Sequence, residues 1–183
     1  MAKRDIKALL SSENDRWMTP VPLFERLDLE FGFTLDAAAE FKTTQVPNNY
    51  FALDHKDPTR RDAMACCWAD YAGGGAVWLN PPYGRGVGAW VRRAYLESRK
   101  GVTVCVLIFA RTETLWWDEF ALGCADEIRY IKGRVTFWDP DTQQPRRDKK
   151  GSPQAATAPS ALLVFRPHWN GPPRHISMRQ HVG

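Results

Sequence analysis

Cysteine is scarce in this sequence, and its spacing excludes the usual cysteine-based sites. The 183 residues include only Cys66, Cys67, Cys105 and Cys124. None of them forms a paired CxxC motif, and the adjacent Cys66 and Cys67 are poorly placed to grip a metal ion together. We therefore expect no metal site and reduced thiols, as in an intracellular protein.

Long hydrophobic runs are also missing. The longest covers residues 102 to 110 and is interrupted by Thr103, whereas a helix that crosses a bilayer needs about 20 apolar residues. Residues 1 to 5, MAKRD, lack the apolar region of a signal peptide. The sequence predicts a cytoplasmic protein that does not contact a membrane.

The composition is that of an ordinary globular protein without internal repeats. Hydrophobic residues make up 44% of the chain and the mean hydropathy is −0.44, and this length favours a single domain over residues 1 to 183. The net charge of +4 and the pI near 9.0 modestly favour a polyanionic partner.

Helix and strand patterns alternate along the chain, which predicts an α/β sheet with crossover helices. Pro20 and Pro22 begin one expected helix, which Gly32 ends. Another has apolar residues at helical spacing, namely Val87, Trp90, Val91, Ala94 and Tyr95. Strands are expected over residues 33 to 35 (ending at Asp36), 49 to 53, 76 to 79, 102 to 109, 127 to 131, 135 to 138 and, last, 161 to 165.

Residues 139 to 159 differ sharply in composition from what surrounds them. This polar stretch contains a cluster of cations, Arg146, Arg147, Lys149 and Lys150. We expect an exposed hairpin loop, since long loops without structure of their own are functional or disordered. A functional loop of this charge would bind phosphates, and the alternative is a solvated tip. We expect the following tail, residues 167 to 183, to be flexible.

The most informative stretch is an apolar strand that ends in Asn80, Pro81, Pro82 and Tyr83. An exocyclic amine on a heteroaromatic ring is a poor nucleophile, because its lone pair is delocalised. The Asn80 side-chain oxygen and the Pro81 carbonyl can accept its hydrogens, and consecutive prolines hold the turn in one shape. Tyr83 offers a ring face on which a flat substrate can stack. This pattern indicates methyl transfer to a planar nitrogen, although the same residues would also form a simple turn.

Five sequence blocks in one order carry a family resemblance. They are Trp17-Met18-Thr19-Pro20, Leu35-Asp36-Ala37-Ala38-Ala39, Asn80-Pro81-Pro82-Tyr83-Gly84, Ala110-Arg111-Thr112-Glu113-Thr114 with Trp117, and residues 131 to 137. In these blocks the chain resembles the phage-type DNA N6-adenine methyltransferases. The resemblance implies a Rossmann-like methyltransferase fold with a mostly parallel twisted sheet and an antiparallel C-terminal hairpin, and S-adenosylmethionine as cofactor.

The resemblance also implies which residues bind that cofactor. Thr19 and Pro20, with Trp17 close by, match the block that contacts the methionine carboxylate. Asp36 matches the acid beside the methionine amine, although an Asp here can equally cap a helix. The family's wider relatives have a glycine-rich loop after this strand. Here Ala37 begins an alanine run, whose small side chains would still allow close approach. Asp54 and Asp62 are the candidates for ribose and adenine.

For the transfer itself, the resemblance implies a target adenine flipped out of the duplex, with its N6 held by Asn80 and Pro81. Arg111 follows the central strand, where it would contact a phosphate or form a structural ion pair. No separate domain is available to recognise the target sequence. The chain could act as a monomer or a homodimer, and a phage protein would work in the bacterial host cytoplasm to protect phage DNA from restriction.

Three other functions fit parts of the pattern. The same acceptors suit N4 of cytosine in DNA, and they also suit a glutamine amide in a protein substrate. A DNA-binding module that has lost catalysis is the third alternative, favoured by the missing glycine-rich loop.

Overall fold

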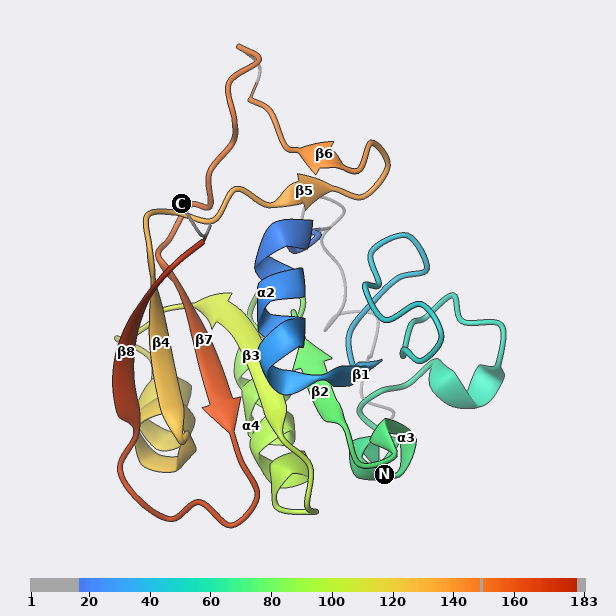
Figure 1. Cartoon of the computed structure of the whole chain (residues 1–183), viewed down its shortest axis with the longest axis vertical. Coiled ribbons are helices and arrows are strands. Elements are labelled where there is room, and N and C mark those ends of the chain that lie inside the picture. The colour runs from blue at the N-terminus through green and yellow to red at the C-terminus, as the bar shows by residue number, and fades with distance from the viewer. Residues whose placement is uncertain (1–16, 149, 181–183) are drawn as a thin grey trace.

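The computed structural model describes residues 17–148 and 150–180, and it shows an α/β protein built on one six-stranded sheet (Figure 1). The strand order is β1-β2-β3-β7-β4-β8. The strands are β1 (Phe33–Asp36), β2 (Ala76–Leu79), β3 (Val104–Phe109), β7 (Ser160–Phe165), β4 (Glu127–Lys132) and β8 (Arg174–Arg179).

Five of these six strands run in the same direction. β1, β2 and β3 pair in parallel, β7 is antiparallel to both β3 and β4, and β8 is parallel to β4. The predicted fold class, a mostly parallel sheet with antiparallel pairing near the C-terminus, is confirmed. The carboxyl ends of β1, β2 and β3 meet at one edge, which is where ligands bind in open α/β sheets.

Helices cover both faces of the sheet, as Figure 1 shows with α2 in front and α4 behind. The α2 helix (Val21–Phe31) packs on one face, and α3 (Trp68–Ala72), α4 (Val87–Ser98) and η2 (Trp117–Leu122) pack on the other. Alternate β3 side chains reach the two faces: Val104 lies in the α4 cluster and Cys105 in the α2 cluster. Burial on both sides explains why β3 is continuously apolar.

The α2 helix forms where its turn signals place it. Pro20 caps it and Pro22 occupies its first turn, where a missing N–H costs nothing. Gly32 ends it in the left-handed conformation at φ 65°. The α4 helix likewise buries Trp90 and Val91 from the predicted apolar face.

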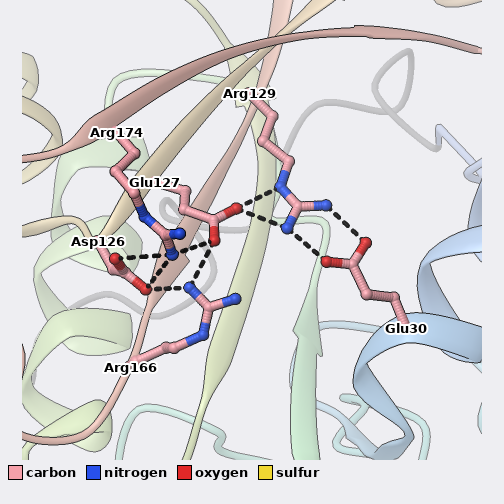
Figure 2. Close-up of polar contacts among 6 residues, drawn as sticks. All are labelled: Glu30, Asp126, Glu127, Arg129, Arg166 and Arg174. Carbon is pink, nitrogen blue, oxygen red and sulfur yellow. Dashed lines mark hydrogen bonds and ion pairs between the residues drawn. The ribbon is translucent and has the colours of Figure 1, made fainter.

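Six charged side chains tie α2 to the strands beside it, and Figure 2 shows their contacts. Arg129 donates to Glu30 at 2.6 and 2.5 Å and to Glu127 at 2.6 Å. Burial acts to raise the pKa of Glu127, but hydrogen bonds from Arg129 and Arg166 outweigh it and hold that pKa below its usual value. The six are Glu30, Asp126, Glu127, Arg129, Arg166 and Arg174.

Two strand predictions are wrong in part. Residues 49 to 53 form no strand, and only Tyr50 bridges to Asp36 beside β1. Of residues 135 to 138 only Trp138 is in a strand, β5 (Trp138–Asp139), which pairs with β6 (Gln144–Pro145) in a separate two-stranded sheet. The polar loop therefore carries a hairpin of its own at its start.

The chain also has elements that the pattern did not reveal. Residues 161 to 165 are not the last strand, because β8 follows inside the stretch expected to be a flexible tail and pairs along its length with β4. The short α3 and the 3-10 turn η1 (Pro58–Arg60) lie in a region without clear periodicity. Among residues 17–148 and 150–180, no helix is long and apolar enough to cross a membrane.

Candidate active site

The turn after β2 presents Asn80 at the carboxyl edge of the sheet. Asn80 is half-buried and uses both ends of its amide: Nδ2 donates to the backbone carbonyl of Trp17 at 2.7 Å, and Oδ1 accepts from the Tyr83 hydroxyl at 2.9 Å. Pro81 is buried and Pro82 is half-buried behind it. The amide orientation is therefore defined from two sides.

Tyr83 lies in an aromatic cluster that sequence reasoning missed. Its ring stacks on Phe109 with centroids 4.2 Å apart and planes 20° apart, and it meets the edge of Phe137 at 5.8 Å. Burial raises the pKa of the Tyr83 hydroxyl, so that it stays a hydrogen-bond donor. Phe109 ends the central strand and Phe137 ends the last recognised block, and these positions were the only sequence signal available.

Trp17 forms the other wall of this cluster. Its ring contacts Phe137 edge-on at 5.3 Å, and the Arg146 guanidinium lies 4.8 Å from the ring centroid. The next residue, Met18, exchanges two backbone hydrogen bonds with Trp138 of β5. The polar stretch with the cation cluster, residues 139 to 159 (the basic loop), is thereby attached to the segment that holds Asn80.

Thr19 and Pro20 continue this segment into α2. Thr19 is 2% exposed, and its Oγ1 is buried without a hydrogen-bond partner in the described part of the chain. Its carbonyl accepts from the Gln45 side chain at 2.8 Å. Buried polar groups without a partner are uncommon in protein interiors, and Trp90 Nε1 and Ser160 Oγ are in the same state elsewhere in the described residues.

Asp36 ends β1 as a buried carboxyl at the same edge. Its side chain is within 3.3 Å of the Ala38 backbone N–H, which makes it a local cap as well. Burial raises the pKa of Asp36 to about 7, against hydrogen bonds from Ala38, Gln45 and Thr44 that lower it. Ala37 is fully buried and donates its backbone N–H to Trp78 in β2.

Asp54 and Asp62 differ in their surroundings. Asp54 is exposed in the turn that follows Tyr50, the residue that bridges to β1. Asp62 is half-buried and accepts a hydrogen bond from the Met64 backbone at 3.0 Å. Asp62 is thus engaged in a local turn, whereas Asp54 is open to solvent.

The predicted cationic residues lie on exposed segments. Arg111 is within 3.8 Å of Glu113, and both side chains are more than half exposed. Arg147 is exposed and donates to the Gly151 carbonyl, and Lys150 is exposed. Lys149 lies outside the described residues. Arg146 is the one packed against Trp17.

Taken together, the carboxyl edge carries an amide oxygen and a proline turn beside stacked aromatic rings, and next to them a buried carboxyl with an unpartnered hydroxyl. This arrangement can bind a planar amine beside a cationic, carboxylate-bearing molecule. The model of the DNA N-6-adenine-methyltransferase (Dam) family matches residues 7–182.

The chain belongs to the Dam family.

A Dam-family relative supports this assignment. The DNA N-6-adenine-methyltransferase of Haemophilus phage HP1 (strain HP1c1) is 29% identical over 160 residues, which cover 85% of this chain and 81% of the relative. The resemblance inferred from the five sequence blocks is confirmed, and with it the enzyme class, an adenine-specific DNA methyltransferase.

Proposed function

We propose that the chain transfers a methyl group from S-adenosylmethionine to N6 of an adenine that is flipped out of DNA. The observation that carries this proposal is the defined Asn80 amide at the carboxyl edge, with Oδ1 oriented by Trp17 and Tyr83. Family membership supports the reaction class, and the residues at this edge offer the hydrogen-bond acceptors and the aromatic ring that the reaction needs.

The role of the turn is to raise the nucleophilicity of N6. Oδ1 of Asn80 has a second lone pair beside the one that Tyr83 uses, and it can accept one N6 hydrogen. The Pro81 carbonyl would accept the other. Two acceptors pull the N6 lone pair out of conjugation with the ring. Alignment of N6 with the methyl group for in-line displacement then supplies much of the rate, and no strong base is needed before methyl transfer.

Tyr83 is proposed to stack on the adenine. Phe109 covers one face of its ring at 4.2 Å, and we propose that the base takes the opposite face. Stacking of a base on an aromatic side chain contributes about 1–3 kcal/mol. Phe109 thereby supports the ring from behind.

The chemistry of the cofactor matches residues at this edge of the sheet. S-Adenosylmethionine would supply an electrophilic methyl group on a positively charged sulfur. The unpartnered Thr19 Oγ1 could donate to a carboxylate, with Pro20 beside it. The buried Asp36 carboxyl would favour a cationic ligand. Asp54 and Asp62 remain our candidates for binding the ribose and the adenine of the cofactor.

DNA is proposed to lie over the basic loop. Arg146, Arg147, Lys149 and Lys150 would bind phosphates, with Arg111 as a further contact at the end of β3. The loop is attached to the Trp17 segment through β5 and Arg146, so DNA held there would lie next to Asn80.

The test is incubation with radiolabelled S-adenosylmethionine and unmethylated DNA, followed by nucleoside analysis. We expect label in N6-methyladenine, and none with the Asn80→Ala variant. Label in N4-methylcytosine instead, or no label in DNA despite cofactor binding, would refute the proposal.

A further inference from the structure

The orientation of the Asn80 amide depends on a group that cannot change its hydrogen-bonding character. An amide looks nearly the same when its oxygen and nitrogen are exchanged, but only the nitrogen can donate. The Trp17 carbonyl, 2.7 Å away, can only accept. The end of the Asn80 side chain that faces Trp17 must therefore be the NH₂ group, and the oxygen must face the other way.

The Trp17 carbonyl is itself held in place. Met18 donates to Trp138 at 3.2 Å and accepts from it at 2.9 Å, which pairs this segment with β5. The Trp17 ring packs between Phe137 and the Arg146 guanidinium. The carbonyl is thus fixed from both the backbone and the side chain.

The same hydrogen bond strengthens the oxygen as an acceptor. When the NH₂ group of an amide donates, electron density moves to its oxygen, since linked hydrogen bonds polarise one another. Oδ1 is the atom that faces the amine in the proposed reaction. The contact with Trp17 therefore acts on both the direction and the strength of the acceptor.

We propose that Trp17 is a positioning residue for methyl transfer, whose backbone carbonyl binds Nδ2 of Asn80 and so presents Oδ1 to the target amine. This inference rests on the proposed function. It gives Trp17 a role on the target side of the site, in place of the cofactor contact expected from the sequence blocks.

The inference explains why residue 80 needs an amide here. In Asn80→Asp, an ionised carboxylate oxygen would face the Trp17 carbonyl oxygen across a space that holds a 2.7 Å hydrogen bond. Two acceptors repel at that distance, and a carboxyl can donate only when it is protonated. The variant should therefore work only in its protonated form.

The experiment compares kcat of Asn80→Asp with kcat of the parent enzyme on DNA between pH 5.5 and 8.5. Because the ratio cancels titrations common to both proteins, it reports on residue 80 alone. We expect the variant to be strongly impaired at pH 8.5. The ratio should rise about tenfold for each pH unit lowered, while the carboxyl stays mostly ionised. A flat ratio, or a variant as active as the parent at pH 8.5, would overturn the role of Trp17.

A second pair of variants protects the test against misfolding of Asn80→Asp. Trp17→Ala removes the ring that anchors the carbonyl, and Trp17→Phe keeps an aromatic ring against Phe137. We expect kcat to fall more in Trp17→Ala, by up to about a hundredfold as a misplacement of about 1 Å can cost, with cofactor Kd unchanged. A weakened cofactor Kd with unchanged kcat would instead assign Trp17 to the cofactor.

A parent enzyme that never labels DNA would refute the proposed function itself, whereas a flat ratio with an active parent refutes only this inference.

Discussion

At the scale of single residues, the candidate site includes two buried polar groups in unusual states. Asp36 is a buried carboxyl with a pKa raised to about 7 by burial, and Thr19 Oγ1 has no partner among the described residues. Buried polar groups are costly unless they serve a ligand or a partner. Asp36 ends β1, and Thr19 lies two residues after Trp17, whose carbonyl binds Asn80; we assign both groups to the proposed cofactor site.

Asn80→Ala removes the proposed hydrogen-bond acceptor but none of the proposed cofactor-binding side chains. We expect turnover to fall below detection, while cofactor affinity changes by less than about twofold because the cofactor loses no contact. Single-turnover assays and equilibrium cofactor binding measure the two quantities separately. Turnover close to that of the parent would contradict the proposed mechanism.

The raised pKa of Asp36 predicts a pH dependence of cofactor affinity. Below about pH 7 the carboxyl is mostly protonated, so binding a cation must release a proton and affinity falls. We therefore expect affinity to rise by about fivefold from pH 6 to pH 7, as the ionised fraction does, and by about a further twofold before it levels off above pH 8. Calorimetric titration at several pH values measures this.

Asp36→Asn is the matching control for the pH experiment. It keeps the size of the side chain and the hydrogen bond from Ala38 but cannot ionise. Its affinity should be weaker and flat across the range. An equal slope in the parent and in Asp36→Asn would show that another group titrates.

At the scale of elements, the ion-pair cluster is the main polar connection between α2 and β4. Arg129 reaches Glu30 on α2 and Glu127 on its own strand, and its side chain is only 11% exposed. Its guanidinium also lies 5.0 Å from the Phe31 ring centroid. A guanidinium this buried is tolerated in the folded protein only while its carboxylate partners are present.

Arg129→Ala should therefore be strongly destabilising. It leaves the Glu127 side chain, 3% exposed, without one of its cations, and breaking a buried pair from one side costs about 3–5 kcal/mol. Urea unfolding gives the free energy directly. Lys42→Ala provides the contrast, because its pair with Asp141 is more than half exposed on both sides and should be worth at most about 1 kcal/mol.

The sequence predicted the elements whose signals are local. Pro20 and Gly32 bounded α2, and the apolar run of β3 was identified to within two residues. The strand β8 was missed because four of its six residues are exposed and Met178 alone is buried, and it is stabilised by pairing with β4. Strands whose stability comes from a distant partner leave little trace in their own composition.

The candidate site was predictable to a similar extent. Asn80, Tyr83 and Asp36 could be identified because each follows an apolar strand. Phe109 and the Trp17 carbonyl could not be assigned to Asn80 and Tyr83, because they approach from other segments of the chain. A backbone carbonyl in particular has no residue type that would reveal it.

At the scale of the whole molecule, the basic loop is a separate structure attached to the top of the sheet in Figure 1. Its β5 strand pairs with Met18, and its turn reaches the loop after β1 through Lys42 and Asp141. Segments that are distant in sequence therefore meet around the site. A ligand bound to the basic loop would be coupled through these contacts to the Met18 segment and to the loop after β1.

Arg147→Ala combined with Lys150→Ala should reduce the salt dependence of DNA binding. If each cation contacts one phosphate, the slope of log K against log salt concentration falls by about one per cation. Fluorescence anisotropy at several salt concentrations measures it. Arg92→Ala combined with Arg99→Ala removes the same charge from exposed positions on and just after α4 and should leave the slope unchanged; a slope that both pairs leave unchanged would make the loop a solvated tip.

The place of β7 in the sheet has a consequence for biosynthesis. β3 and β4 do not pair with each other, and β7, made after both, fills the space between them. Until residues 160 to 165 have left the ribosome, a nascent chain exposes the edges of β3 and β4 that β7 will cover, and unpaired strand edges are prone to aggregate. The sheet thus closes late in translation, and an incomplete polypeptide released early would be a substrate for chaperones and proteases rather than a partly active enzyme.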